Sequence, residues 1–361
     1  MVFTVAAQEK PINNLEIGDQ APPFDLPGTD GKNYSLNDFS EYPLLVVIFT
    51  CNHCPTAQAY EDKIIKIVED YRLKGVGFVA ISPNDPNAVS LSELGYSDLN
   101  DGLDDMKIRA KEKQYNFPYL YDGETQAVSL EYGPVATPHV FVFDQDRALK
   151  YSGRIDDTED PYVTPGNLDL IRALDQLLDQ KPVETARTKT FGCSIKWSWK
   201  NSWTEKLKQQ WAEEPVTLEE MNLNQIRELV ANSSENYRLI NLWATWCGPC
   251  LIEMPELVNT DRMYRGRSFE FITISTDKPN KKAKALQILT KMEAANQNYL
   301  YNGDDIYELI EVIDKNWKGS LPYTLLIAPG GEIVFANEGI VEPFELRMEI
   351  VKNLGRYYAD D

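Results

Sequence analysis

The chain has 361 residues, which is too long for one ordinary domain and suits two domains that each bury a substantial core. Its 56 acidic and 36 basic residues give a net charge of −20, which argues against nucleic acid or an anionic membrane as the main partner. No uninterrupted apolar run is long enough for a transmembrane helix, because such a helix needs about 18 or more such residues.

The first residues leave two interpretations open. Residues 2–8 resemble the end of a signal peptide, because small side chains follow an apolar stretch. They lack the charged region and full apolar core of such a peptide, so an ordinary chain terminus is equally compatible.

The first strong pattern is a strand followed by a cysteine pair and a helix. Two short strands around a glycine turn are expected over residues 18–36, and the apolar run Leu44–Phe49 predicts a buried strand. Cys51 and Cys54 follow, and the apolar spacing through Tyr71 predicts a helix.

Strands and helices continue to alternate after this motif. We expect a strand at 76–82, a polar insertion at 84–100, a helix at 103–115, a strand led by Pro138 at 137–143, and a helix over 168–178. This order predicts a central mixed β-sheet with helices on both faces.

An aromatic-rich segment, residues 184–214, joins the two halves. It contains Cys193 and tryptophans at 197, 199, 203 and 211. Four tryptophans carry a large apolar area, so burial against one or both domains is favoured over a ligand-stacking role. Cys193 is either a third redox cysteine that pairs with Cys51 or a small buried side chain.

The second half repeats the strand, cysteine pair and helix. A strand is predicted at 238–244 and a helix at 251–264, with Trp246-Cys247-Gly248-Pro249-Cys250 between them. Cys-x-x-Cys spacing alone serves zinc, a structural disulfide or thiol exchange. Near a helix N-terminus the thiolate of Cys247 is stabilised, which makes it the nucleophile and places Cys250 to resolve a mixed disulfide.

This pentapeptide resembles the thioredoxin active site, and residues 253–257 resemble the TlpA-like branch of that superfamily. The resemblance covers roughly the last 150 residues. It implies a strand at 269–276 and a cis-proline at Pro322 facing the disulfide. Asn241 stands where thioredoxin has a buried acid, so Glu253 is expected to be the acid near this site.

The start of the chain, residues 18–36, resembles the peroxiredoxin-like families (AhpC/TSA, redoxin). Peroxiredoxins carry Pro-x-x-x-Thr-x-x-Cys. Counting back from Cys51 gives Ile48 and Leu44, and counting back from Cys54 gives Cys51 and Val47, so neither register keeps the motif. Because the start of the chain resembles these families but the peroxide motif is missing, a peroxidase with an antioxidant role is kept only as the alternative interpretation.

Together these patterns predict an α/β protein with two thioredoxin-like domains, each a central mixed sheet flanked by helices. The expected boundaries are 1–183, a linker at 184–214, and 215–361. The predicted function is thiol-disulfide exchange at two sites with protein or interdomain disulfides. The TlpA-like resemblance implies a periplasmic or otherwise extracytoplasmic location, with the cytoplasm as the alternative.

The two sites differ in the residues between their cysteines. His53 precedes Cys54, as in oxidising members of the superfamily, and is expected to stabilise the Cys51 thiolate and raise the reduction potential. The Gly248-Pro249 insert lacks this help. Electrons are then expected to flow from the second site to the first.

Other chemistries are weighed against this prediction. No dinucleotide or phosphate-binding loop occurs, so no cofactor is expected and electrons come from another thiol protein. A zinc site shared by the two cysteine pairs is disfavoured, because they lie in separate turns. Cys51, Cys54 and His139 are a weaker candidate for copper, since an ordinary buried histidine is favoured. An inert disulfide in a docking domain is a further alternative.

Overall fold

A computed structural model of the chain describes residues 12–357, so the leader-like residues 2–8 lie outside the described part. The chain divides into two compact units. The first holds residues 12–90, 99–204 and 356–357, and the second holds residues 91–98 and 205–355. Across residues 12–357, none of the helices combines the length and apolar character that a membrane span requires.

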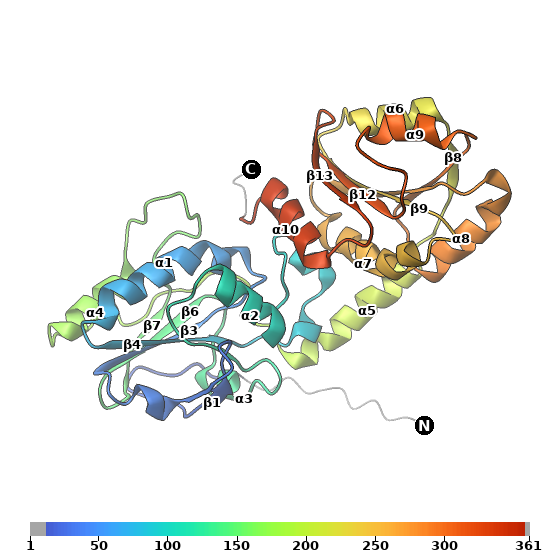
Figure 1. The fold of residues 1–361 in the computed structure, drawn as a ribbon. Helices are drawn as coiled ribbons and strands as arrows, with labels where there is room; N and C mark the ends of the chain where they lie inside the picture. Colours follow the sequence, from blue (N-terminus) through green and yellow to red (C-terminus); the bar gives the residue numbers. More distant parts are fainter. Residues whose placement is uncertain (1–11, 358–361) are drawn as a thin grey trace, which may run out of the picture. The chain divides into compact units, whose positions relative to one another are not determined.

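The first unit is built on a five-stranded mixed sheet in the order β5-β4-β3-β6-β7 (Figure 1). β3 pairs in parallel with β4 and antiparallel with β6. The strand bounds are β3 Leu44–Phe49, β4 Val76–Ser82, β5 Tyr119–Tyr121, β6 His139–Phe143 and β7 Leu149–Gly153, and a separate hairpin pairs β1 Asp25–Pro27 with β2 Asn33–Ser35.

Alternating side chains of β3 supply both cores of this unit, because successive residues of a strand point to opposite faces. Val46 and Ile48 pack with α1 (Pro55–Arg72) and α4 (Asp169–Leu178). Val47 and Phe49 pack on the other face with α3 (Ala127–Tyr132) and the hairpin. Figure 1 shows α1 and α4 on one side of the sheet and α3 on the other. The edge strand β5 is preceded by α2 (Leu103–Glu112).

The second unit contains a six-stranded mixed sheet in the order β13-β12-β9-β10-β11-β8. β9 pairs in parallel with β10 and antiparallel with β12. The strand bounds are β8 Glu219–Met221, β9 Tyr237–Trp243, β10 Phe269–Ser275, β11 Gln297–Tyr301, β12 Tyr323–Ile327 and β13 Ile333–Glu338.

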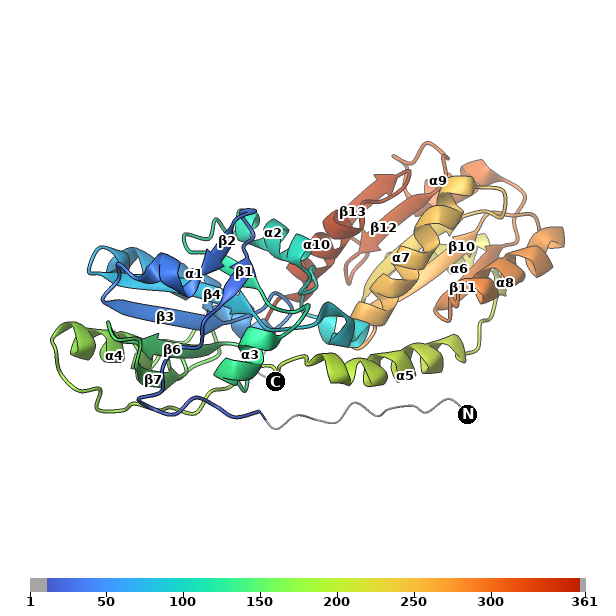
Figure 2. The same ribbon diagram turned by 90° about the horizontal axis from the view of Figure 1, so that it is seen from below.

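Helices cover both faces of this second sheet. α6 (Leu223–Ala231) and α9 (Ile306–Ile313) bury Ile226 and Leu309 against one face. α7 (Gly248–Tyr264) and α10 (Pro343–Leu354) lie on the opposite face. Figure 2 views the unit from the side of α7. The unit also contains α8 Lys282–Lys291 and most of α5 Asn201–Ala212.

Two segments differ from the predicted organisation. The polar insertion is structured: it holds 3₁₀ turns at Pro86–Ala88 and Leu91–Leu94, and residues 91–98 pack with the second unit, where Tyr264 donates to the Ser97 carbonyl at 2.7 Å. The aromatic-rich segment is divided between the units: Trp197 is buried in the first, and Trp211 is buried in the second beside Arg262.

Candidate active sites

The cysteine pair of the second unit lies where β9 leads into α7. Cys247 caps the N-terminus of α7 and forms a disulfide with Cys250, with 5.3 Å between their Cα atoms. The Cys250 N–H donates to the Cys247 sulfur at 3.2 Å. Trp246 beside the pair is 71% exposed, whereas Cys247 is 4% exposed and Cys250 is fully buried. The N-terminus of α7 therefore lies at the first cysteine of this pair, where the N–H groups of the helix favour the thiolate form of Cys247.

Glu253 follows Cys250 by one helical turn and is buried. One carboxylate oxygen accepts a hydrogen bond from the Asn241 side chain at 2.8 Å, and the other accepts from the Val341 N–H at 3.0 Å. Burial raises the pKa of this carboxyl, although both hydrogen bonds act in the opposite direction. Asn241 thus holds the acid instead of supplying it. The peptide before Pro322 is cis, as the resemblance implied.

The cysteine pair of the first unit has a different relation to its helix. β3 ends at Phe49, but α1 begins only at Pro55, so the N-cap residue is the second cysteine, Cys54. Cys51 lies in the turn before the helix and is 3% exposed, and Cys54 is fully buried. The same Cys-x-x-Cys spacing therefore presents a different cysteine to the helix terminus in each unit.

The loop before β6 contacts both thiols of the first pair. The hydroxyl of Thr137 lies 3.1 Å from the Cys51 sulfur, and its carbonyl oxygen lies 3.4 Å from the Cys54 sulfur. The peptide between Thr137 and Pro138 is cis. Pro138, predicted to begin the strand, therefore lies in the loop beside the pair, and β6 starts one residue later at His139.

Cys193 comes from the aromatic-rich segment and reaches the same site. Its N–H donates to the Cys54 sulfur at 3.3 Å, and its carbonyl accepts from the Thr137 N–H at 2.9 Å. Cys51, Cys54 and Cys193 are all thiols, and Cys193 is partly exposed. The sequence suggested Cys51 as the partner of Cys193, whereas this N–H contact is to Cys54.

His53 and Asp101 form a buried ion pair beside these thiols. Nδ1 of His53 lies 2.6 Å from one oxygen of Asp101, and Asn84 donates to the same oxygen at 2.7 Å. The other Asp101 oxygen accepts from the N–H groups of Asn52 at 2.8 Å and His53 at 3.1 Å. Burial is the largest single influence on His53 and lowers its pKa, but the charge and hydrogen bond of Asp101 together with the Cys54 charge outweigh it, so the pKa is raised. Burial is also the largest influence on Asp101 and raises its pKa, but the His53 charge together with the hydrogen bonds from His53 and Asn84 outweighs it, so that pKa is lowered.

Of the two motif thiols, Cys54 rather than Cys51 has the lowered pKa, which differs from the prediction that His53 stabilises the Cys51 thiolate. Burial opposes ionisation of Cys54, but hydrogen bonds from Cys193 and Cys51 and the His53 charge hold its pKa well below the usual range. Burial, followed by the hydrogen bond to Cys54 and the Asp101 charge, raises the pKa of Cys51 well above that range. The physical reason is the later start of α1, which brings Cys54 instead of Cys51 to the helix N-terminus.

His139 offers no nitrogen to the thiols, so it does not complete the copper site that was the weaker candidate, and the favoured interpretation of an ordinary buried histidine agrees with its contacts. Its Nδ1 accepts from the Val135 N–H at 3.3 Å, and its Nε2 lies 3.1 Å from the Ser152 hydroxyl. Burial lowers the pKa of His139 to about 3. Cys51, His53 and Asp101 do bring ligand atoms within 4.8 Å of one another, but hydrogen bonds already occupy His53 Nδ1 and both Asp101 oxygens.

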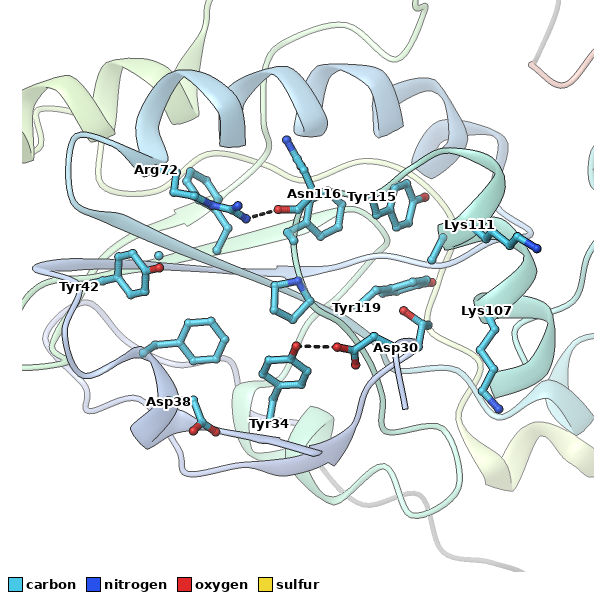
Figure 3. A pocket seen from close by; sticks show the side chains of 17 residues that line it. Asp30, Tyr34, Asp38, Tyr42, Arg72, Lys107, Lys111, Tyr115, Asn116 and Tyr119 are labelled. Carbon is cyan, nitrogen blue, oxygen red and sulfur yellow. Dashed lines mark hydrogen bonds between the residues drawn. The ribbon is translucent and has the colours of Figure 1, made fainter. Parts of the chain in front are cut away.

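A cavity of about 700 Å³ lies in the first unit, and its aromatic lining includes Tyr34 of β2, Tyr119 of β5 and, from connecting segments, Tyr42 and Tyr115 (Figure 3). Asp30 accepts a hydrogen bond from Tyr34 at 2.9 Å in this cavity, and Arg72 donates to the Asn116 carbonyl. Tyr119 lines it and also donates to the Asn52 side chain at 3.4 Å. The cavity is thus joined to the Cys51 turn through one tyrosine, while the three thiols are not among its lining residues.

Sequence reasoning missed Asp101, Thr137 and Asn84 as parts of the first site. Asp101 directly follows the segment that was interpreted as a polar insertion. Its position beside His53 depends on a contact across 48 residues, which no local pattern encodes. A buried histidine between two cysteines was the available signal, because a buried charge requires a partner.

Comparison with known proteins agrees with two related domains in tandem. A Redoxin family model matches residues 16–169, and an AhpC/TSA family model matches residues 215–336. Among curated proteins, thiol-disulfide oxidoreductase ResA of Halalkalibacterium halodurans is 30% identical over 118 residues, which is 31% of this chain and 61% of the relative. ResA of Bacillus subtilis is 24% identical over 95 residues, covering 26% of this chain and 49% of the relative. The chain thus spans about half to three-fifths of these relatives' length.

Two solved structures of bacterial proteins are also similar to part of this chain. An uncharacterized conserved protein from Geobacillus kaustophilus is 38% identical, with a TM-score of 0.46, and the match covers 52% of this chain and 94% of that protein's chain. A hypothetical protein from Sinorhizobium meliloti is 33% identical, with a TM-score of 0.45, and the match covers 52% of this chain and 97% of that protein's chain.

Proposed function

The chain belongs to the thioredoxin superfamily and carries two domains of that superfamily in tandem, and from this premise we propose that it is a thiol-disulfide oxidoreductase with two exchange sites. The observation that carries the proposal is the Cys247–Cys250 disulfide at the N-terminus of α7. In the reduced state the Cys247 thiolate would attack a substrate disulfide and form a mixed disulfide. Cys250 would then attack Cys247, restore the intramolecular disulfide and release the substrate as a dithiol.

Each residue around the second site has a role in this proposal. The N–H of Cys250 donates to the Cys247 sulfur, so it favours the thiolate form of the nucleophile. The raised pKa of Glu253 suits it to accept a proton as Cys250 becomes a nucleophile. The exposed Trp246 borders the cysteine and offers an apolar surface to a protein substrate.

The first site is proposed as a second exchangeable pair, Cys51 and Cys54. A stabilised Cys54 thiolate favours the dithiol form, so this disulfide would be the more oxidising of the two. Electrons would then pass from the second pair to the first when the two exchange. We include an extracytoplasmic location in the proposal, because disulfide chemistry persists in oxidising compartments.

Peroxide reduction is the second candidate function, and one observation favours it. Cys54 combines a lowered pKa with two neighbouring thiols, and either thiol could condense with a sulfenic acid formed on Cys54. The complete burial of Cys54 and the absence of the peroxiredoxin motif count against it.

One experiment separates the two functions. The reduced full chain is mixed either with insulin or with hydrogen peroxide, and turnover is compared among single Cys→Ser variants. Cys247→Ser should abolish insulin reduction, and Cys250→Ser should accumulate a mixed disulfide on Cys247. Full insulin reduction by Cys247→Ser would overturn the proposal, and fast peroxide consumption that depends on Cys54 would favour the peroxidase.

A further inference from the structure

The first site has a problem of access that its two motif cysteines do not solve. The two pairs are similarly buried, but the cysteine at the helix N-terminus differs: in the first unit it is the fully buried Cys54, and in the second it is Cys247, which is 4% exposed and adjoins the exposed Trp246. Thr137 contacts both sulfurs, and the Cys193 N–H lies against Cys54. Thiol-disulfide exchange requires the attacking sulfur to reach the disulfide, so a buried thiol reacts slowly with a bulky partner.

Cys193 is the one thiol of this group that is partly exposed, and it packs against Cys51, Cys54 and Ala57. We infer that Cys193 is a third redox cysteine, through which the buried pair exchanges with outside disulfides by way of a Cys54–Cys193 disulfide. This inference rests on the proposed function of the first site and adds to it the route by which a peptide or protein disulfide reaches that site.

The backbone around Cys193 is anchored on both sides, so its position beside Cys54 is not that of a loose loop. Upstream, the Ser152 N–H donates to the Ala186 carbonyl at 2.9 Å. Downstream, the Lys196 N–H donates to the Asn84 side chain at 2.8 Å. Cys193 itself pairs with Thr137 as an isolated β-bridge. We call residues 186–196 the strap.

Gly192 allows the strap to approach this closely. Its φ of +121° is a backbone conformation that other residues rarely adopt. A Cβ atom there would lie 2.0 Å from the Thr137 carbonyl oxygen. A glycine is therefore required directly before Cys193 for the strap to lie on the Thr137 loop.

The contacts of the first site make Cys54 the central thiol of the three, because the Cys193 N–H donates to its sulfur at 3.3 Å and Cys51 packs in the same cluster. Hydrogen bonds from both Cys51 and Cys193 stabilise its thiolate, so each neighbouring thiol is oriented toward it. A nucleophile between two thiols can form a disulfide with either one. Exchange between these two disulfides needs no movement of Cys54 out of the core.

The transfer can be written in three balanced steps. Cys193, after losing its proton, attacks a disulfide R–S–S–R′, forms Cys193–S–S–R and expels R′–S⁻. The Cys54 thiolate attacks the Cys193 sulfur, forms the Cys54–Cys193 disulfide and expels R–S⁻, which takes up the proton from Cys193. Cys51 then loses its proton to Cys193 as it attacks Cys54, giving the Cys51–Cys54 disulfide and the Cys193 thiol. Two electrons have passed to the substrate.

The test uses the full chain with Cys247→Ser and Cys250→Ser, which leaves only the three cysteines of the first site. The reduced parent is mixed with glutathione disulfide, samples are quenched by alkylation, and peptide mapping identifies the disulfides over time. We expect the Cys54–Cys193 disulfide first and the Cys51–Cys54 disulfide afterwards. Adding Cys51→Ser should leave the Cys54–Cys193 disulfide as the final product.

Adding Cys193→Ser should slow oxidation of the remaining pair by about 10-fold or more, because access limits the rate. Ser194→Ala, at an exposed neighbouring position, is the matched control and should keep the parent rate. An unchanged rate with Cys193→Ser overturns the relay but leaves the exchangeable pair intact. If the parent forms neither disulfide, the redox role of the first site fails together with the relay.

A measurement without substitutions guards against misfolded variants. In the reduced wild-type chain, brief treatment with N-ethylmaleimide should modify Cys193 before Cys51 and Cys54. Equal or faster modification of either buried cysteine would contradict the assigned entry point.

Discussion

Nδ1 of His53 lies 2.6 Å from the carboxylate of Asp101, and both side chains are buried beside the thiols of the first unit. A buried charge is tolerated when it is paired and hydrogen-bonded, and the contacts of Asp101 with Asn84 and two backbone N–H groups meet that condition. The pairing with Asp101 raises the pKa of His53, and the His53 charge is one of the influences that lower the pKa of Cys54.

The first prediction concerns this pair and the reduction potential. Asp101→Asn removes the charge that raises the pKa of His53, so the Cys54 pKa should rise and the first disulfide should become harder to reduce. We expect the potential to fall by at least ~30 mV, which corresponds to about one pKa unit of thiolate stabilisation. Redox titration against glutathione measures it, with the exposed Asp104→Asn on α2 as the control.

In the unmodified chain the first pair should have the higher potential of the two. A higher potential at Cys247 and Cys250 would reverse the proposed direction of electron flow. If Asp101→Asn keeps its fold and the reduction potential of the first pair does not change, His53 does not set that potential.

The second prediction concerns Glu253. Glu253→Gln keeps one oxygen that can accept from Asn241 or Val341 but cannot take up a proton. We expect insulin reduction to slow by about 10-fold or more. The rate should also lose the pH dependence that the raised pKa of Glu253 produces above the usual carboxyl range. Glu256→Gln, three residues later at an ion pair with Arg347, is the control and should retain the wild-type profile.

The third prediction concerns His139 and acid stability. Its pKa of about 3 in the folded chain lies below that of an unfolded histidine, because burial and the Arg187 charge disfavour the proton. Between these two pKa values only the unfolded state binds that proton, so the free energy of unfolding should decrease as the pH falls. The total effect is on the order of 5 kcal/mol, at about 1.4 kcal/mol per pH unit.

Denaturant unfolding between pH 5 and pH 6.5 measures this slope before most carboxylates titrate. His139→Gln should flatten the slope, and His53→Gln should preserve the contribution from His139. These are the two histidines of the chain, and the buried Asp261, whose pKa is raised to about 6, titrates in the same range in every variant, so the slope is compared with that of the wild-type chain. A slope that His139→Gln leaves unchanged would show that another group carries it.

The fourth prediction concerns Gly192. Gly192→Ala adds a Cβ atom that clashes with the Thr137 carbonyl and also strains the positive φ, so it should destabilise the first unit by about 2 kcal/mol or more. Gly18→Ala has a φ of +99° and no atom within 4 Å of its Cβ, so it measures the strain alone. We expect it to cost about 1 kcal/mol. Equal losses of unfolding free energy would indicate that the strap moves away without cost.

Strong local patterns predicted the elements that present the cysteines. The apolar runs fixed β3 at Leu44–Phe49 and β4 at Val76–Ser82, with the bounds seen in the structure. The helix predicted at 103–115 ends earlier, at Glu112, because Gln114 adopts a left-handed conformation with a φ of 54°. Periodicity reports burial, whereas helix ends depend on single backbone angles.

The electrostatics of the first site could not be predicted in the same way. The sequence shows His53 between Cys51 and Cys54 but not which cysteine caps the helix, and that detail decides which sulfur carries the charge. Asp101 and Cys193 reach the site from 48 and 139 residues away. Such pairings arise from the folded sheet and carry no periodic signal of their own.

The late start of α1 also has a kinetic meaning for the living cell. The sulfur at the N-terminus of α1 is fully buried, so in the proposed relay no outside thiol or disulfide reaches it directly. The partly exposed Cys193 would then set how fast the first unit equilibrates with the thiols around it. The corresponding cysteine of the second unit, Cys247, lies beside the exposed Trp246 instead.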